Sequence, residues 1–153
     1  MCDFGSVVFL SLVWRVGKRE RKDKNVFKIV SKEALTDAIY LMDVEAPRVA
    51  KNCLPGQFVI VRGSEDGERI PLTICDYSRE AGTITIVFQV VGAATEMMKN
   101  LKAGDSFTDF VGPLGRPSEL VEEDLETLKN KKILFVAGGV GAAPVYPQFK
   151  WMH

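Results

Sequence analysis

This 153-residue sequence contains a single histidine, His153, which is also its last residue. Its three cysteines, Cys2, Cys53 and Cys75, are odd in number, far apart and without a CxxC spacing. Such a set indicates neither a disulfide framework nor a four-ligand metal site. We therefore expect no metal ligands in this chain, and the reducing cytoplasm as its location.

The sequence also lacks an excess of charge of either sign, because 20 Lys and Arg residues balance 20 Asp and Glu residues. This balance gives no reason to expect nucleic acid or anionic lipid as the main partner. The apolar run 7–14 is far shorter than the roughly 20 residues of a membrane-spanning helix. Its cations follow it, whereas those of a secretory signal precede it, so the sequence predicts neither a membrane span nor export.

Residues 1–25 differ from the rest, with this apolar run followed by a cluster of Lys and Arg. We expect a disordered or non-native extension. A weak membrane-surface anchor and a partner-binding arm are the functional alternatives.

From Val26 onward the sequence alternates apolar and polar residues as β-strands do. The expected strands are 27–35, 38–45, 54–62, 69–74, 83–91 and 106–111, with a short helix at 95–102. Six short strands at this spacing predict a mainly β fold, a closed antiparallel Greek-key barrel over residues 26–113.

The strand Arg69–Ile74 has the most informative side chains. In extended geometry its odd-numbered residues face one way and its even-numbered residues the other. The two sets are Arg69, Pro71 and Thr73, and Ile70, Leu72 and Ile74. The even set can pack in a core while the odd set meets an anionic ligand with a hydrogen-bonding ring edge. The alternative is an ordinary edge strand, where proline is tolerated.

The exit from the fifth strand is a second candidate site. Gly92 permits close backbone approach, and Thr95 can cap the helix that follows. The free amides and dipole of such a helix favour an anion such as phosphate.

Beyond the barrel, residues 118–130 read as an acidic, partly helical connector. Residues 132–137 are typical of a fully buried parallel strand, and the glycine turn 138–141 follows at once, with Pro144 tolerated in the first turn of a helix. A glycine turn between a strand and a helix is typical of a dinucleotide phosphate site, although the pattern here is GxGxxP rather than GxGxxG.

Four stretches in order, RIPLTI, VFQVVGAATEMM, GPLGRPSE and ILFVAGGVGAAP, resemble the ferredoxin-reductase-like FAD/NAD-binding flavoproteins. Within that family the resemblance is strongest to the electron-transfer subunit of dihydroorotate dehydrogenase and to the small subunit of NADH-dependent ferredoxin:NADP oxidoreductase, or sulfide dehydrogenase. It runs from about Val26 to the end of the chain, so Val26 can be read as the native start.

The resemblance implies a role for each stretch. The barrel would bind FAD, with the Thr73 hydroxyl near flavin N5. Arg69 would be a pyrophosphate clamp, although it stands four residues before Thr73 where many relatives have three. The residues expected along the isoalloxazine are Ile70, Pro71, Leu72 and Thr73, with backbone contacts from Val87, Phe88 and Gln89. Those expected at the pyrophosphate are Gly92, Ala94 and Thr95, and those at the nicotinamide nucleotide are Gly138, Gly139, Gly141 and Pro144.

The implied function is an FAD-binding electron-transfer subunit of a multisubunit oxidoreductase. It would pass electrons between NAD(P)H and an iron–sulfur centre or ferredoxin, alongside a larger flavin/iron–sulfur subunit. No catalytic side chain is expected, because the flavin does the chemistry. The family's [2Fe-2S] cysteine cluster has no match here. Two alternatives stay open: a non-catalytic barrel that docks a larger subunit, and the reductase component of an oxygenase.

The sequence ends after one strand and one helix start of a Rossmann-like α/β NAD(P)-binding domain. We therefore expect a fragment in which 114–153 are a connector and an incomplete domain. Residues 130–153 are expected to be poorly ordered, and the fragment alone inactive.

Overall fold

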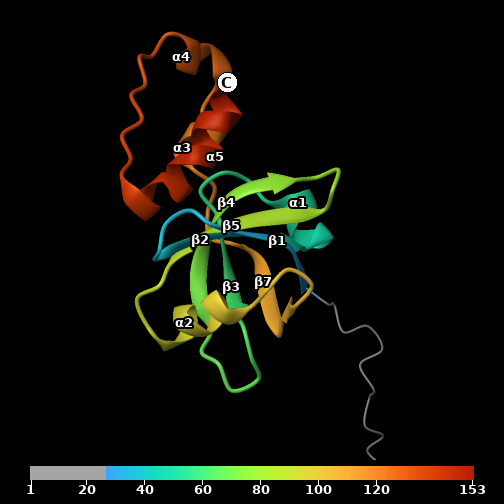
Figure 1. The fold of residues 1–153 in the computed structure, drawn as a ribbon. Helices are drawn as coiled ribbons and strands as arrows, with labels where there is room; N and C mark the ends of the chain where they lie inside the picture. The colour runs from blue at the N-terminus through green and yellow to red at the C-terminus, as the bar shows by residue number, and fades with distance from the viewer. Residues whose placement is uncertain (1–26) are drawn as a thin grey trace, which may run out of the picture.

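The computed structural model describes residues 27–153, so the prediction for residues 1–25 lies outside the described residues. The strands are β1 (Phe27–Ala34), β2 (Ile39–Glu45), β3 (Phe58–Arg62), β4 (Ile70–Ser78), β5 (Thr83–Gln89), β6 (Ser106–Phe107) and β7 (Asp109–Leu114). The helices are α1 (Pro47–Asn52), α2 (Ala93–Asn100), α3 (Glu119–Glu122), α4 (Leu125–Lys129) and α5 (Ala142–Met152), with a 3₁₀ turn η1 (Gly139–Gly141). In Figure 1 the strands form one rounded body, and α3, α4 and α5, orange to red, lie together beyond one side of it.

The predicted antiparallel barrel is confirmed. The strand order is β6-β1-β2-β5-β4-β3-β7, so β2 and β3 are consecutive in the chain but separated in the sheet by β5 and β4. The two outermost strands, β6 and β7, are joined by Thr108 alone, which brings the sheet edges together and nearly closes it. The predicted sixth strand, 106–111, was wrong in this detail. It divides at Thr108 because its first part pairs with β1 and its second with β3.

The barrel interior is filled by side chains from alternate strand positions. Its largest fully buried strand members are Phe88, Ile29, Met42, Ile74, Ile84, Ile86, Val44, Val59 and Val61, and Met98 of α2 adds to them. Burying one such side chain contributes about 1.5–3 kcal/mol relative to leaving it exposed. The core therefore fixes which residues of each strand face outward, and the candidate sites lie on that outer face.

Two short helices flank the barrel. The sequence analysis missed α1, which has Pro47 at its start and buries Val49 and Ala50. The signal was present, because proline is favoured in the first turn of a helix. The predicted helix at 95–102 is confirmed as α2, two residues earlier than expected.

The C-terminal segment differs from the prediction. The buried strand predicted at 132–137 is wrong, since these residues are irregular and the side chains of Leu134 and Val136 are 84% and 79% exposed. A strand needs a hydrogen-bonded neighbour, and residues 27–153 supply none here. The prediction that residues 130–153 are poorly ordered is also wrong, because α5 forms there and packs against β4. The predicted helical connector is confirmed by α3 and α4.

Candidate cofactor site

The first half of β4 has one free edge. Residues 70–73 pair with β3 on one side only, and pairing with β5 begins at Ile74. Pro71 lies in this half and is exposed, as expected for a residue without an amide hydrogen. Ile74 is 1% exposed, and Ile70 and Leu72 pack against the same core, which confirms the predicted direction of the even-numbered residues.

Arg69, just before β4, is held by a carboxylate of β7. Its Nη2 lies 2.7 Å from Oδ2 of Asp109, and Nε of Arg62 lies 2.7 Å from the same oxygen. Both guanidinium groups therefore share one carboxylate, in a loop that also carries Glu65, Asp66 and Glu68. The Arg69 side chain is 58% exposed, so it can still meet a ligand from solvent.

The start of α2 has a closed, self-bonded turn. The Thr95 hydroxyl accepts hydrogen bonds from the amides of Val91 (3.0 Å) and Gly92 (3.1 Å) and donates to the Gly92 carbonyl (2.9 Å). The N-cap residue is Gly92, and the Thr95 hydroxyl contributes to the cap from the third helical position, as in a capping box. The expectation that Thr95 caps the helix is therefore wrong only in the position of the N-cap residue. Thr95 is 8% exposed and holds the turn from inside. The amides of the first helical turn, at Ala93 and Ala94, are left for another partner.

The loop leading to Arg69 packs against α2. A Cβ on Gly63 would lie 2.9 Å from Met97 Sδ, and one on Gly67 would lie 2.8 Å from Met97 Cε. This contact places the Arg69 strand and α2 on one side of the barrel. The structure thus brings together two stretches about 25 residues apart that the sequence assigned to the same ligand.

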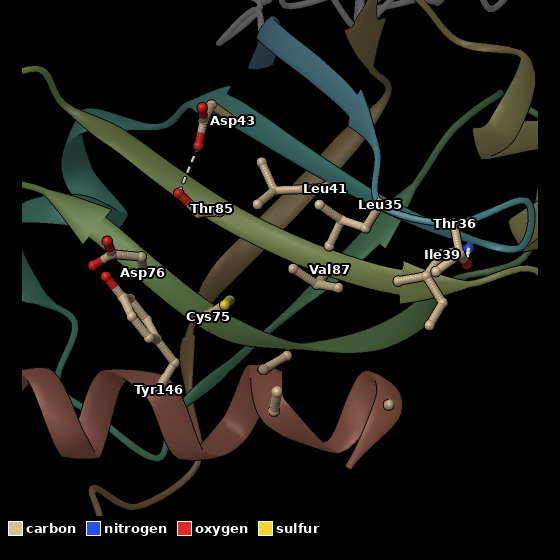
Figure 2. Close-up of a pocket in the computed structure, with 13 residues that line it drawn as sticks. Leu35, Thr36, Ile39, Leu41, Asp43, Cys75, Asp76, Thr85, Val87 and Tyr146 are labelled. Carbon is tan, nitrogen blue, oxygen red and sulfur yellow. Dashed lines mark hydrogen bonds between the residues drawn. The ribbon is translucent and has the colours of Figure 1, made fainter. Parts of the chain in front are cut away.

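A second feature is a cavity of about 550 Å³ between the outer face of the sheet and the start of α5. Figure 2 shows β2, β5 and β4 as one wall and the C-terminal helix as the other. Its lining residues are Leu35, Thr36, Ile39, Leu41, Asp43, Cys75, Asp76, Thr85, Val87, Gly139, Ala142, Ala143 and Tyr146.

The predicted residues divide between the two features. Val87 and Gly139 line the cavity, although more than 50 residues separate them in the chain. Phe88 points inward, 2% exposed, and stacks on Tyr40. Gln89 ends β5 on the exposed side. The remaining predicted residues are outside the cavity: Arg69 to Thr73 on the β4 side, Gly92, Ala94 and Thr95 at α2, and Gly138, Gly141 and Pro144 around η1 and the first turn of α5.

The sequence analysis missed Asp43, Thr85 and Tyr146. Asp43 and Thr85 are directly opposite on β2 and β5, and the Thr85 hydroxyl donates a 2.6 Å hydrogen bond to Asp43 (Figure 2). A polar residue on the outer face of a barrel strand is ordinary, so the sequence pattern gave no signal. Only the helix lying above turns this face into a cavity wall.

The two described cysteines are buried and free. Burial is the main cause that raises the pKa of the Cys53 thiol to about 11. Burial, then the carboxylates of Asp76 and Asp43, raises the pKa of the Cys75 thiol. A thiol held in its protonated form is a poor nucleophile, so the environment of Cys75 is that of a small hydrophobic residue rather than of a redox centre.

Residues 27–153 contain neither a membrane-spanning helix nor a metal-binding cluster. None of the helices there has both the length and the hydropathy needed to cross a membrane. The same residues contain no group of three or more His, Cys, Asp or Glu side chains placed to hold a metal ion.

The barrel is that of the ferredoxin reductases. A chain in the structure of the NADH-dependent reduced ferredoxin–NADP oxidoreductase is 42% identical and superimposes with a TM-score of 0.60, over 61% of this chain and 34% of that one. No protein-family profile matches the chain.

Proteins similar in sequence point to a narrower class within the ferredoxin reductases. A protein of Thermotoga maritima described as a homologue of the dihydroorotate dehydrogenase B (NAD⁺) electron transfer subunit is 42% identical over 78% of this chain and 40% of its own length. An uncharacterised protein of Clostridium beijerinckii, encoded in the adh 3′ region, is 62% identical over 84% of this chain and 43% of its own length. The chain is a homologue of these two proteins, one of which is described as an electron transfer subunit homologue, and it spans less than half the length of either.

Proposed function

We propose that this chain binds FAD and is the flavin-carrying part of an electron-transfer subunit of a multisubunit oxidoreductase. In this role it would pass electrons between NAD(P)H and an iron–sulfur centre or ferredoxin. The observation that carries the proposal is the packing of the Arg69 loop against α2, which puts the half-exposed Arg69 guanidinium and the open amides of a helix on one side of a ferredoxin-reductase barrel.

The start of α2 fits the pyrophosphate of FAD. A Cβ on Gly92 would meet no atom within 4 Å other than its chain neighbours, so the space in front of the turn is open. The amides of Ala93 and Ala94 and the positive end of the helix dipole face that space. Arg69 would add charge from the neighbouring strand, because Asp109 neutralises only one of its two arginine partners.

The free edge of β4 fits the ring system. Residues 70–73 have unpaired backbone on one side, and Pro71 keeps a second strand from pairing there. The Thr73 hydroxyl makes no hydrogen bond to residues 27–153 and would face the ring edge. Val87, Phe88 and Gln89 would contribute backbone contacts from β5.

Bound FAD would supply the redox chemistry, and the chain would supply orientation and electrostatics. The cavity is lined by no histidine, and neither described cysteine is activated. No side chain is therefore assigned a proton-transfer role, and the assigned residues all act by binding.

The glycine turn would begin the nicotinamide nucleotide site. Gly139 has φ +55°, and a Cβ on Gly138, Gly139 or Gly141 would meet no atom within 4 Å. A backbone turn with this much open space can approach a pyrophosphate closely. Pro144 lies in the first turn of α5, where its missing amide hydrogen costs nothing.

The partners and location are part of the proposal. The named relatives are electron transfer subunits, which supports a larger oxidoreductase subunit as partner. A [2Fe-2S] centre would belong to parts of the system outside this chain, and ferredoxin is the expected external carrier. The expected location is the cytoplasm.

The test is a substitution that leaves the helix cap intact while blocking the anion. Aspartate is a better N-cap than glycine, so Gly92→Asp should preserve α2 but place a carboxylate where the pyrophosphate is expected. We expect FAD affinity, measured by quenching of flavin fluorescence, to fall at least about tenfold, since a like charge in such a site costs more than about 1.4 kcal/mol.

The matched control is Ala103→Asp, which makes the same charge change in the exposed loop after α2. It should leave the FAD affinity within about twofold of the parent value, because exposed charges a Debye length apart are screened. Absence of saturable quenching by the parent chain would contradict FAD binding and favour a barrel that only docks a partner.

A further inference from the structure

A row of polar side chains crosses the outer face of the barrel at one end of the cavity. Ser31 on β1 is paired with Asp43 on β2, Asp43 with Thr85 on β5, and Thr85 with Asp76 on β4. Because directly opposed residues share a face, the four side chains point the same way. Asp43, Thr85 and Asp76 line the cavity, and Figure 2 shows the first two joined by a hydrogen bond.

The two carboxylates of this row differ in their partners. Asp76 is neutralised by Lys150 of α5, whose Nζ lies 2.8 Å from both carboxylate oxygens. Asp43 instead accepts hydrogen bonds of 2.6 Å from two neutral hydroxyls, those of Ser31 and Thr85. Within residues 27–153, no Lys, Arg or His forms an ion pair with Asp43.

These two hydrogen bonds fix the orientation of the Asp43 carboxylate but do not use all of its acceptor positions. Each oxygen accepts one hydroxyl and has a second acceptor position, because a carboxylate has about four lone-pair sites. A carboxylate that is oriented, partly buried and unpaired by any cation attracts a donor from a ligand.

Most of the remaining cavity wall is apolar. Leu35, Ile39, Leu41 and Val87 form the sheet wall, and Ala142 and Ala143 form the helix wall. Tyr146 and Thr36 also line it, and the Thr36 hydroxyl already accepts hydrogen bonds from the amides of Ala38 and Ile39. The volume of about 550 Å³ is within the usual range for small-molecule sites, and the facing apolar walls favour a flat ring system.

We propose that this cavity receives an aromatic ring with a hydrogen-bond-donating end, and that Asp43 is the residue that selects for that donor. The inference rests on the proposed function, because Val87 is expected beside the flavin and Gly139 belongs to the glycine turn. A flavin ring N–H and a nicotinamide carboxamide share the required chemistry.

Two pairs of probes test the selection and distinguish the two sources. Lumiflavin and 3-methyl-lumiflavin differ only in the ring N–H, and 1-methylnicotinamide and 1-methyl-N,N-dimethylnicotinamide, which carry the same charge, differ only in the carboxamide N–H groups. Binding to the full 153-residue chain is followed by flavin fluorescence and by protein NMR shifts. In one of the two pairs, we expect the member with the donor to bind at least about fivefold more tightly than the member without it. That pair identifies the bound ring as flavin or nicotinamide.

Asp43→Asn should remove most of this preference, weakening the donor-bearing probe by about tenfold, since hydrogen bonds to charged groups contribute about 1.5–3 kcal/mol. The probe without the donor should change less than about twofold. Asp37→Asn is the matched control, because Asp37 lies in the exposed β1–β2 turn and does not line the cavity.

Thr85→Val is the second variant, since it frees one Asp43 oxygen while retaining the carboxylate. It should keep the donor preference even if Asp43→Asn lowers the melting temperature. Equal binding within both pairs by the parent chain, or equal weakening of both members by Asp43→Asn, overturns the proposal. FAD affinity and its response to Gly92→Asp are measured on the same protein. Intact FAD binding without donor preference rejects only this inference, whereas donor preference without FAD binding rejects only the proposed function.

Discussion

At the scale of single residues, neighbouring side chains on one strand have different environments. On β4, Thr73 is half-buried and its hydroxyl bonds to none of residues 27–153, whereas Cys75 is buried and its thiol pKa is raised. Asp76, one residue after Cys75, forms an ion pair with Lys150 of α5. Within four positions of β4, side chains therefore go from a hydroxyl open to a ligand, to the core, to an ion pair.

The Thr73 hydroxyl is expected to affect the flavin more than the fold. Thr73→Ala should lower the free energy of unfolding by no more than about 1 kcal/mol, because the hydroxyl bonds to none of residues 27–153 and only one half-buried methyl group is lost. The flavin reduction potential should shift measurably when the chain is loaded with FAD. Thr83→Ala on β5, also half-buried but outside the site, is the control. A large drop in melting temperature with an unchanged potential would make Thr73 structural.

At the scale of elements, α2 is attached to the barrel at both ends. Thr95 closes its first turn, and Lys32 of β1 donates hydrogen bonds to the carbonyls of Lys99 and Leu101 at its C-terminal end. The Lys32 ammonium also lies 4.9 Å from the centroid of the Tyr40 ring. A cation at this end complements the helix dipole and satisfies carbonyls that lack an intrahelical partner.

Removing the Lys32 ammonium should loosen α2 without disturbing the core. Lys32→Met should lower the free energy of unfolding by about 1 kcal/mol, a value reduced for partial solvent exposure. For a domain of this size that corresponds to roughly 3 °C in melting temperature. Lys28→Met, an exposed residue of the same strand, should change the melting temperature by less than about 1 °C. Equal effects of the two substitutions would show that the contacts to α2 contribute nothing.

At the scale of the whole molecule, the barrel and the C-terminal segment differ in their regular structure. The barrel strands form one sheet around a core, whereas residues 132–137 pair with no strand of the described residues. The barrel has a continuous core and nearly closed edges. The segment 132–137 is irregular and mostly exposed, with Ile133 and Phe135 half-buried, and α5 is held to the barrel mainly through β4, including the Asp76–Lys150 ion pair. A dinucleotide site of this class needs several parallel strands, and residues 27–153 form none.

We expect the 153-residue chain, loaded with FAD, to oxidise NADH at least about a hundredfold more slowly than the Thermotoga maritima relative at equal FAD occupancy. Without a strand partner for residues 132–137, the glycine turn is not held in the strand–turn–helix geometry of a dinucleotide site, and a misplacement of the nicotinamide ring by about 1 Å can cost that factor. Reduction of a dye acceptor by NADH measures the rate. Comparable turnover by the two proteins would show that the barrel, α5 and the glycine turn suffice.

The local alternation of apolar and polar residues was enough to predict the barrel. Alternation on strands such as Thr83–Gln89 dictates which side chains are buried, and Pro71 marks a free edge because of its own chemistry. The four stretches also identified the family, since their order is itself a property of the sequence. Glycine and threonine before α2 indicated a turn open to an anion, although the exact cap was misassigned between two residues that bond to each other.

Tertiary structure alone decided the rest. Residues 132–137 have a strand composition, but strand formation depends on a neighbour elsewhere in the chain, so the pattern could not predict their irregular course. Asp43 is an ordinary outward-facing residue in sequence. It becomes a cavity residue only because Ser31, Thr85 and α5 are brought around it from distant positions. Periodicity reports the environment of a strand's two faces, whereas a site depends on which other segments meet that face.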